Sequence, residues 1–196
     1  MGRHGLLTLS AVAAGAVAAT IAATARGTVL PEVPFADGAR RASAVVAARA
    51  IGSTTGWGAT PAGRTRIYTT FRFEVESVLA GAATSRTLAV PVIGGEMDGR
   101  RLVVPGTPEF RPGDRCVLLL DPADAFTGLV GWTQGVFRIV RDPAGADRVL
   151  FHDGAAVAGF RDGKALRGTR PIPLAEFAAE VVRARAESPG AGGDRR

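Results

Sequence analysis

The stretch Ile67-Tyr68-Thr69-Thr70-Phe71-Arg72-Phe73-Glu74-Val75 alternates between two kinds of side chain along its whole length. One set is mainly apolar and comprises Ile67, Thr69, Phe71, Phe73 and Val75. The set between them, which continues to Glu76, is mainly polar. A period of two places successive side chains on opposite faces of a β-strand. We therefore expect a half-buried strand here, with one face turned towards a core.

The residues on both sides of this stretch predict further strands separated by turns. Apolar or alternating runs suggest strands over residues 44–50, 87–92, 116–120, 129–140 and 149–151. Asp98-Gly99 is a two-residue hairpin signal between two apolar runs. Residues 52–63 are rich in glycine, serine and threonine and predict a loop. The glycine-rich region up to Arg170 shows no clear pattern.

A helix is expected near the C-terminus. After Pro173, apolar side chains recur at helical spacing, at Leu174, Phe177, Ala178, Val181 and Val182. Such a helix packs its apolar face on a sheet. The predicted fold class is mainly β: a small antiparallel, partly closed barrel of the OB type, or a sandwich, with one C-terminal amphipathic helix.

The N-terminal residues have the three parts of a secretory signal peptide. Arg3 and His4 precede an apolar run from Gly5 to Ala25, which ends in Ala23-Thr24-Ala25. Alanine and glycine supply little transfer free energy to a membrane, so we expect cleavage after Ala25 rather than a retained anchor. The mature protein is then expected to be secreted or periplasmic, without stable membrane insertion.

These signals divide the chain into five expected segments. They are a signal peptide (1–25), a linker (26–40), a β-rich domain (41–170), a helix packed on that domain (171–187) and a disordered tail (188–196).

The net charge of +6 over 196 residues is spread along the chain. Basic residues occur in ones and twos, as at Arg100-Arg101, and no basic stripe or reading helix accompanies them. We expect no nucleic-acid partner.

Few residues are suited to catalysis or metal binding. Cys116 is the single cysteine, and His152 is the single histidine left after signal cleavage. No zinc, calcium, serine-hydrolase or phosphate-loop spacing occurs, so no metal or cofactor is expected. Cys116 begins an apolar run and is expected to be a buried packing residue. An exported hydrolase or transpeptidase that uses a Cys116/His152 dyad is the alternative enzymatic hypothesis.

Carboxylates offer a second enzymatic interpretation. Glu74 and Glu76 share one face of a strand and, together with Glu96, could imitate the paired carboxylates of a glycosidase. A solvated strand face flanked by Arg72 explains the two strand residues more simply.

Binding is the function that the sequence favours. Trp57 stands between two glycines in the predicted loop, where aromatic contact residues collect. With the hairpin residues Glu96 and Arg100, it forms the expected contact surface for a ligand or an exported protein partner. The leading hypothesis is a non-enzymatic exported binding module. A structural envelope protein with a retained N-terminal anchor is the third hypothesis.

Residues 67–120 resemble a group of uncharacterised exported bacterial proteins that look like small β-barrels. The shared residues are mainly of core and turn types: Phe71, Phe73, Val75, Val78, Leu79, Gly81, Gly94, Gly95, Val104, Pro105, Gly106, Pro108, Phe110, Gly113 and Val117 to Leu120. Such barrels are similar in outline to the inhibitory domain of tissue inhibitors of metalloproteinases. That domain binds the protease zinc through an N-terminal cysteine, which the mature chain beginning near Arg26 lacks. The resemblance therefore implies a fold and no activity.

Overall fold

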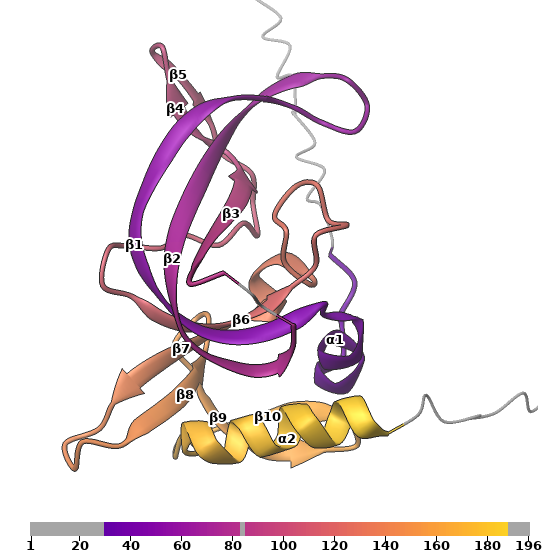
Figure 1. The fold of residues 1–196 in the computed structure, drawn as a ribbon, viewed down its shortest axis with the longest axis vertical. Coiled ribbons are helices and arrows are strands. Elements are labelled where there is room, and N and C mark those ends of the chain that lie inside the picture. Colours follow the sequence, from indigo (N-terminus) through magenta and orange to yellow (C-terminus); the bar gives the residue numbers. More distant parts are fainter. Residues whose placement is uncertain (1–29, 83–84, 188–196) are drawn as a thin grey trace, which may run out of the picture.

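Two long strands, β1 (Ala44–Ala59) and β2 (Thr65–Gly81), form an antiparallel hairpin that curves through the molecule (Figure 1). The structure, a computed structural model, describes residues 30–82 and 85–187. The hairpin register shifts at three places in β1, between Val45 and Gly52. Such bulges bend a strand and increase its twist, which explains why this ribbon curls rather than lying flat.

The sheet is antiparallel and has the strand order β10-β9-β8-β7-β6-β1-β2-β3. Its two edge strands, β10 and β3, do not pair with one another, so the barrel is not fully closed. A small second sheet contains β4 and β5. The remaining elements are α1 (Phe35–Arg41), β3 (Thr87–Ile93), β4 (Gly95–Met97), β5 (Arg100–Leu102), β6 (Arg115–Leu120), η1 (Trp132–Gly135), β7 (Val136–Arg141), β8 (Asp147–Phe151), β9 (Ala156–Arg161), β10 (Lys164–Gly168) and α2 (Leu174–Ala186). The predicted fold class is confirmed.

The central strands are buried on both faces, and alternate residues enter two different cores. On β6, Val117 and Leu119 pack in a core with the helices, whereas Cys116 and Leu118 pack in a core enclosed by the curled sheet. β1 divides its residues in the same way. Burial on both faces explains why β6 is a continuous apolar run while β2 alternates.

Helix α1 belongs to the core, although the sequence predicts a linker over residues 26–40. Phe35 is buried, and its ring contacts those of Phe137, Phe160 and Phe177 with centroids 4.6–5.9 Å apart. Phe177 comes from α2, which lies with β9 and β10 at the lower end of the molecule in Figure 1. A helix of seven residues is too short to show a recognisable helical periodicity in the sequence. Its contacts with α2 and the sheet explain why it forms.

The predicted loop over residues 52–63 is wrong for most of its length. β1 continues to Ala59, and every residue from Ser53 to Ala59 has a partner in β2. The turn is confined to Thr60–Arg64, where the amide of Thr60 donates to the carbonyl of Arg64. The threonines of this segment favour strand, and pairing with β2 overrides the three glycines, Gly52, Gly56 and Gly58, that suggested a loop.

The structure differs from the predicted elements at two further places. The strand expected over residues 129–140 is shortened to β7, because Gly128, Gly131 and Trp132 have positive φ. The unpatterned glycine-rich region contains the β9–β10 hairpin. The expected C-terminal helix and the Asp98-Gly99 hairpin are both confirmed. The predicted signal peptide and disordered tail lie outside the described residues.

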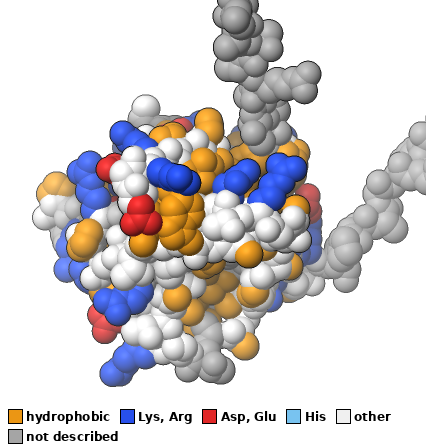
Figure 2. Space-filling view, turned by 90° about the horizontal axis from the view of Figure 1, so that it is seen from above, with side chains coloured by type: hydrophobic (Ala, Val, Ile, Leu, Met, Phe, Trp, Pro, Cys, Tyr) orange, Lys and Arg blue, Asp and Glu red, His pale blue; other side chains and the backbone are white. Residues whose placement is uncertain are grey.

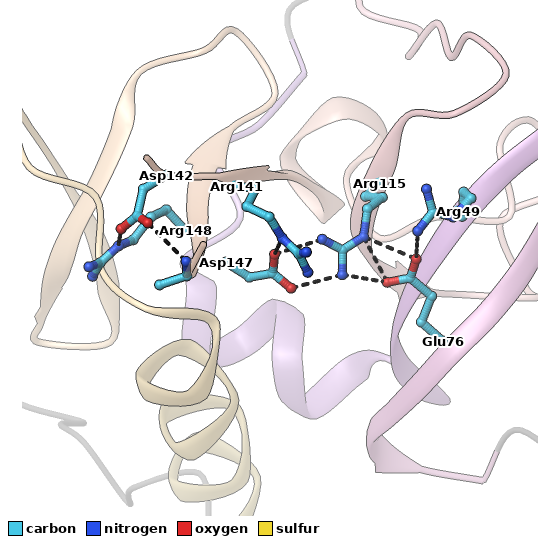
Figure 3. Close-up of polar contacts among 8 residues, drawn as sticks. Arg49, Glu76, Arg115, Arg141, Asp142, Asp147 and Arg148 are labelled. Carbon is cyan, nitrogen blue, oxygen red and sulfur yellow. Dashed lines mark hydrogen bonds and ion pairs between the residues drawn. The ribbon is translucent and has the colours of Figure 1, made fainter. Parts of the chain in front are cut away.

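An ion-pair network crosses five strands on one face of the sheet (Figure 3). Arg115 on β6 is at its centre and lies 2.7 Å from both Glu76 of β2 and Asp147 of β8. Arg49 of β1 and Arg141 of β7 extend the network at its two ends. Hydrogen bonds from Arg115 are the main cause that lowers the pKa of both carboxyls. Glu76 is therefore an ionised structural partner, whereas a general acid needs a raised pKa.

Candidate binding site at the tip of the first hairpin

Trp57 lies near the end of β1, on the strand rather than in a loop, and its side chain is 43% exposed. Its cross-strand partner is the buried Ile67 of β2. Because Trp57 lies on a paired strand, the sheet fixes the position of its backbone. The expected loop position of Trp57 is therefore wrong, and its role as a contact residue stays a prediction.

The β4–β5 hairpin meets this end of β1 and fixes the indole. Nε1 of Trp57 donates to Oδ2 of Asp98 over 2.9 Å, although the two residues are 41 apart in sequence. Asp98 and Gly99 form the two-residue turn, both with positive φ, as this turn type requires. β4 lies against both β1 and β2, and the close approach depends on Gly95. A Cβ at Gly95 would lie 2.4 Å from Oγ1 of Thr69.

The structure places Glu96 and Arg100 at the same end as Trp57, and both are exposed. Glu96 is the partner of Arg101, whereas Arg100 is the partner of Met97. Because cross-strand partners share a face, Glu96 and Arg100 lie on opposite faces of the β4–β5 hairpin. The three predicted contact residues therefore share one end of the molecule but do not converge on one point.

A hollow of about 380 Å³ borders Trp57. Its floor includes the cross-strand pair Thr54 and Thr70, and Tyr68 lines it as well. Tyr68 and Thr70 lie on the face of β2 opposite Phe71, which points into the inner core. Ala125, from the loop between β6 and η1, completes the wall. With Pro91 of β3, the hollow thus has contributions from four separate segments of chain.

Tyr68 is a lining residue that the sequence does not predict. Its side chain is 9% exposed, and its Oη is buried without a hydrogen-bond partner among the described residues. Burial is the main cause that raises the pKa of Tyr68 above 10.0, and Arg66 acts in the opposite direction. The available signal was a lone tyrosine on the polar face of the alternating strand.

The surface around this end is mixed in character. Figure 2 views the molecule from above and shows basic side chains scattered among hydrophobic and uncharged ones, with fewer acidic side chains. The charge is distributed rather than gathered into one continuous basic patch.

A second hollow, of about 400 Å³, lies beside His152. Its charged rim consists of groups that already pair with one another: Lys164 with Glu32 at 3.3 Å, and Arg167 with Asp153 at 2.7 Å. The side-chain amide of Gln134 is also engaged, through bonds with Val33 and Pro31. The polar groups of this hollow serve mainly to hold the segment before α1 in place.

Cys116 and His152 do not have the properties of a catalytic pair. The thiol is 2% exposed, and burial raises the pKa of Cys116 to about 12, which keeps it protonated. Burial and Arg138 lower the pKa of His152. In the part of the chain that the structure describes, no hydrogen bond joins the two side chains. Cys116 packs in the inner core, as the sequence predicts.

Within residues 30–82 and 85–187, no helix is long and apolar enough to cross a membrane. Across the same residues, no three His, Cys, Asp or Glu side chains are grouped so that they could hold a metal ion.

No protein-family model matches the chain, and no curated protein or solved structure matches it significantly. The geometry of the site is therefore the basis for any functional assignment.

Proposed function

We propose that this protein is an exported binding module whose recognition surface is the end formed by the tip of β1–β2 and the β4–β5 hairpin. The hydrogen bond between Trp57 and Asp98 is the observation that supports this function most strongly. It holds an exposed aromatic ring between two hairpins, in an orientation that needs no ordering when a partner binds. Tryptophan is enriched among residues that dominate binding energy, and preorganisation lowers the entropic cost of association.

Glu96 and Arg100 form the charged rim of this surface. Both are exposed, and neither forms an ion pair within the described part of the chain. Charges at a rim influence partner choice and the rate of association more than affinity. The expected partner is another exported component of the same cell, and an exported protein is the leading class.

A capture experiment tests this function. The full-length chain is expressed in an exporting host and recovered after export, and its intact mass is measured to identify the N-terminus. The protein is then immobilised and exposed separately to exported proteins and to envelope fragments. We expect Trp57→Ala to remove most of the retained material while the circular dichroism spectrum stays unchanged.

The control is Val182→Ala, which removes an exposed apolar side chain from α2, away from the tip. It should leave capture unchanged. Equal retention by folded Trp57→Ala and by the wild-type protein would refute the assignment of this surface. A recovered chain that retains residues 1–25 would refute cleavage and favour an anchored protein.

A further inference from the structure

The hollow beside His152 has an apolar floor formed by side chains from α1, β7, β8 and β10. Phe137 of β7 and Phe151 of β8 are cross-strand partners, so their rings share one face of the sheet, with centroids 5.8 Å apart. Phe35 of α1 contacts Phe137 on that face, and Ala165 of β10 packs against the same core. These side chains therefore converge on one space of about 400 Å³.

Charged side chains of both signs surround this floor, and their charges cancel. Glu32 and Asp153 are acidic, whereas Lys164 and Arg167 are basic. Burial is the main cause that lowers the pKa of His152, so its ring adds no charge at neutral pH. A protein with a net charge of +6 thus contains a hollow that is neutral overall but presents both signs at its rim.

The ion pairs at the rim leave binding capacity on one group of each sign. Within the described residues, Arg167 donates one hydrogen bond, to Asp153 over 2.7 Å, so the guanidinium has further donors to offer. Arg115 of the same protein already binds two carboxylates at once. Glu32 contacts Lys164 through Oε1 at 3.3 Å, and its carboxylate has a second oxygen. A ligand can therefore bind both groups without breaking either pair.

The position of Arg167 suits it to hold a carboxylate above the apolar floor. Its Cζ lies 4.5 Å from the centroid of the Phe151 ring. A cation–π contact of this kind orients the guanidinium, which binds carboxylates in a planar, bidentate manner. A ligand whose carboxylate meets Arg167 thus has its apolar part close to Phe151.

We propose that this hollow binds a short peptide with free termini and apolar side chains. The peptide carboxylate binds Arg167, its ammonium binds Glu32, and an apolar side chain covers the rings of Phe137 and Phe151. Such a zwitterion matches both signs of the rim, whereas an ion of one sign meets attraction and repulsion together. The volume lies within the range of roughly 300–1,000 Å³ found for ligand sites.

This peptide site is separate from the recognition surface proposed above, and the inference does not rest on that surface. The hollow is bordered by α1 and β10, which lie in the lower part of the molecule in Figure 1. The β4–β5 hairpin lies at the top of the same view. The protein thus has two places at which different ligands can bind.

Calorimetric titration of the full-length protein recovered after export tests this inference. Leucyl-phenylalanine is the probe, and its N-acetyl and C-terminal amide forms each lack one terminal charge. Glycylglycine has both charges but no apolar side chain. We expect saturable binding of leucyl-phenylalanine, roughly tenfold weaker binding of either blocked form, and no saturable binding of glycylglycine.

Two variants identify the groups that bind the peptide termini. Arg167→Gln should weaken leucyl-phenylalanine roughly tenfold and leave the amide form unchanged, because the amide has no carboxylate to lose. Glu32→Gln should act in the same way on the free peptide and leave the N-acetyl form unchanged. Arg161→Gln is the matched control and should change neither, since Arg161 is exposed on β9 and does not line the hollow. All three residues are exposed, so thermal unfolding should change little.

The outcomes separate this inference from the proposed function. Saturable binding that weakens in Arg167→Gln and Glu32→Gln, and only for peptides with the matching free terminus, would support the site. No saturable binding, equal affinity for the blocked peptides, or an equal loss in Arg161→Gln would overturn it. Capture that depends on Trp57 is measured independently, so failure of the peptide site leaves the proposed function standing, and the reverse also holds.

Discussion

Gly58 is the residue that allows Tyr68 to close the side of the candidate site. The ring lies so near the backbone of β1 that a Cβ at Gly58 would be 2.8 Å from Cδ2 of Tyr68. Its neighbour Gly56 has open space around the same position. Neither glycine has a positive φ, so the two differ only in the space around the position that a Cβ would occupy. Substitution of these two glycines, which look alike in the sequence, should therefore have different effects.

We predict that Gly58→Ala displaces the Tyr68 ring and returns its pKa towards 10.0, the usual value. The variant should lose about 1–3 kcal/mol of stability through overpacking, whereas Gly56→Ala should be neutral or slightly stabilising. Tyr68 is the single tyrosine, so tyrosinate absorbance during an alkaline titration reports on it alone. Identical titration curves for the two variants would contradict this account.

The same titration predicts how stability depends on pH. The folded-state pKa of Tyr68 lies above the unfolded value, so its contribution to stability is fully present below pH 10.0. That contribution is lost as the pH rises through the folded-state pKa. Chemical denaturation at a series of alkaline pH values measures this decline, which Tyr68→Phe should reduce. The remaining decline is expected from Cys116, because burial raises the pKa of its thiol to about 12.

At the scale of elements, Arg115 joins strands that are not all neighbours in the sheet. Its side chain is 19% exposed and donates to Glu76 and Asp147 from the middle of the network in Figure 3. A planar guanidinium can bind two carboxylates at once, which an ammonium cannot do with the same geometry. Arg141, at 67% exposure, contacts the same Asp147 at 3.4 Å and is screened by solvent.

We predict that Arg115→Lys lowers stability by about 1–3 kcal/mol near neutral pH, since several charged hydrogen bonds are lost. Arg141→Lys, the matched control, should change it by about 0.5 kcal/mol or less. The pKa values of Glu76 and Asp147 are lowered in the folded protein, so their contribution is present above 4.5 and 3.8 and is lost as the pH falls further. Acid denaturation should therefore begin at higher pH in Arg115→Lys. Equal acid midpoints for the two variants would show that Arg115 has no special role.

At the scale of the whole molecule, the segment before β1 completes the outer core. Phe35 of α1 contacts aromatic rings from β7, β9 and α2, so residues from both ends of the described chain meet at one place. Arg185 of α2 also donates to the carbonyls of Ala39 and Ala42. The domain therefore begins before the boundary at residue 41 that composition suggested.

We predict that Phe35→Ala lowers the free energy of unfolding by about 3–5 kcal/mol, as expected for removal of a buried phenylalanine. Phe126→Ala, at a ring that is 37% exposed, is the control and should cost about 1 kcal/mol or less. Urea denaturation measures both. A small effect of Phe35→Ala would mean that residues 26–40 behave as the linker expected from the sequence.

The sequence by itself determined the features that depend on near neighbours along the chain. The alternation over residues 67–75, the continuous apolar run of β6, the Asp98-Gly99 turn and the periodicity of α2 all reflect local backbone geometry. These patterns were sufficient for the fold class and for the burial of Cys116. The contact surface expected at Trp57, Glu96 and Arg100 also rests on a local signal, a tryptophan between two glycines, and it stays a prediction.

Only the tertiary structure decided the features that depend on a distant partner. β1 extends to Ala59 because β2 supplies its hydrogen bonds, and α1 is ordered because Phe35 meets α2 and the sheet. Trp57 is fixed by an aspartate 41 residues away, and the orphaned hydroxyl of Tyr68 becomes visible only when its surroundings are known. The spacing of residues along the sequence does not reveal such contacts, because each depends on how the bulged hairpin curls in space.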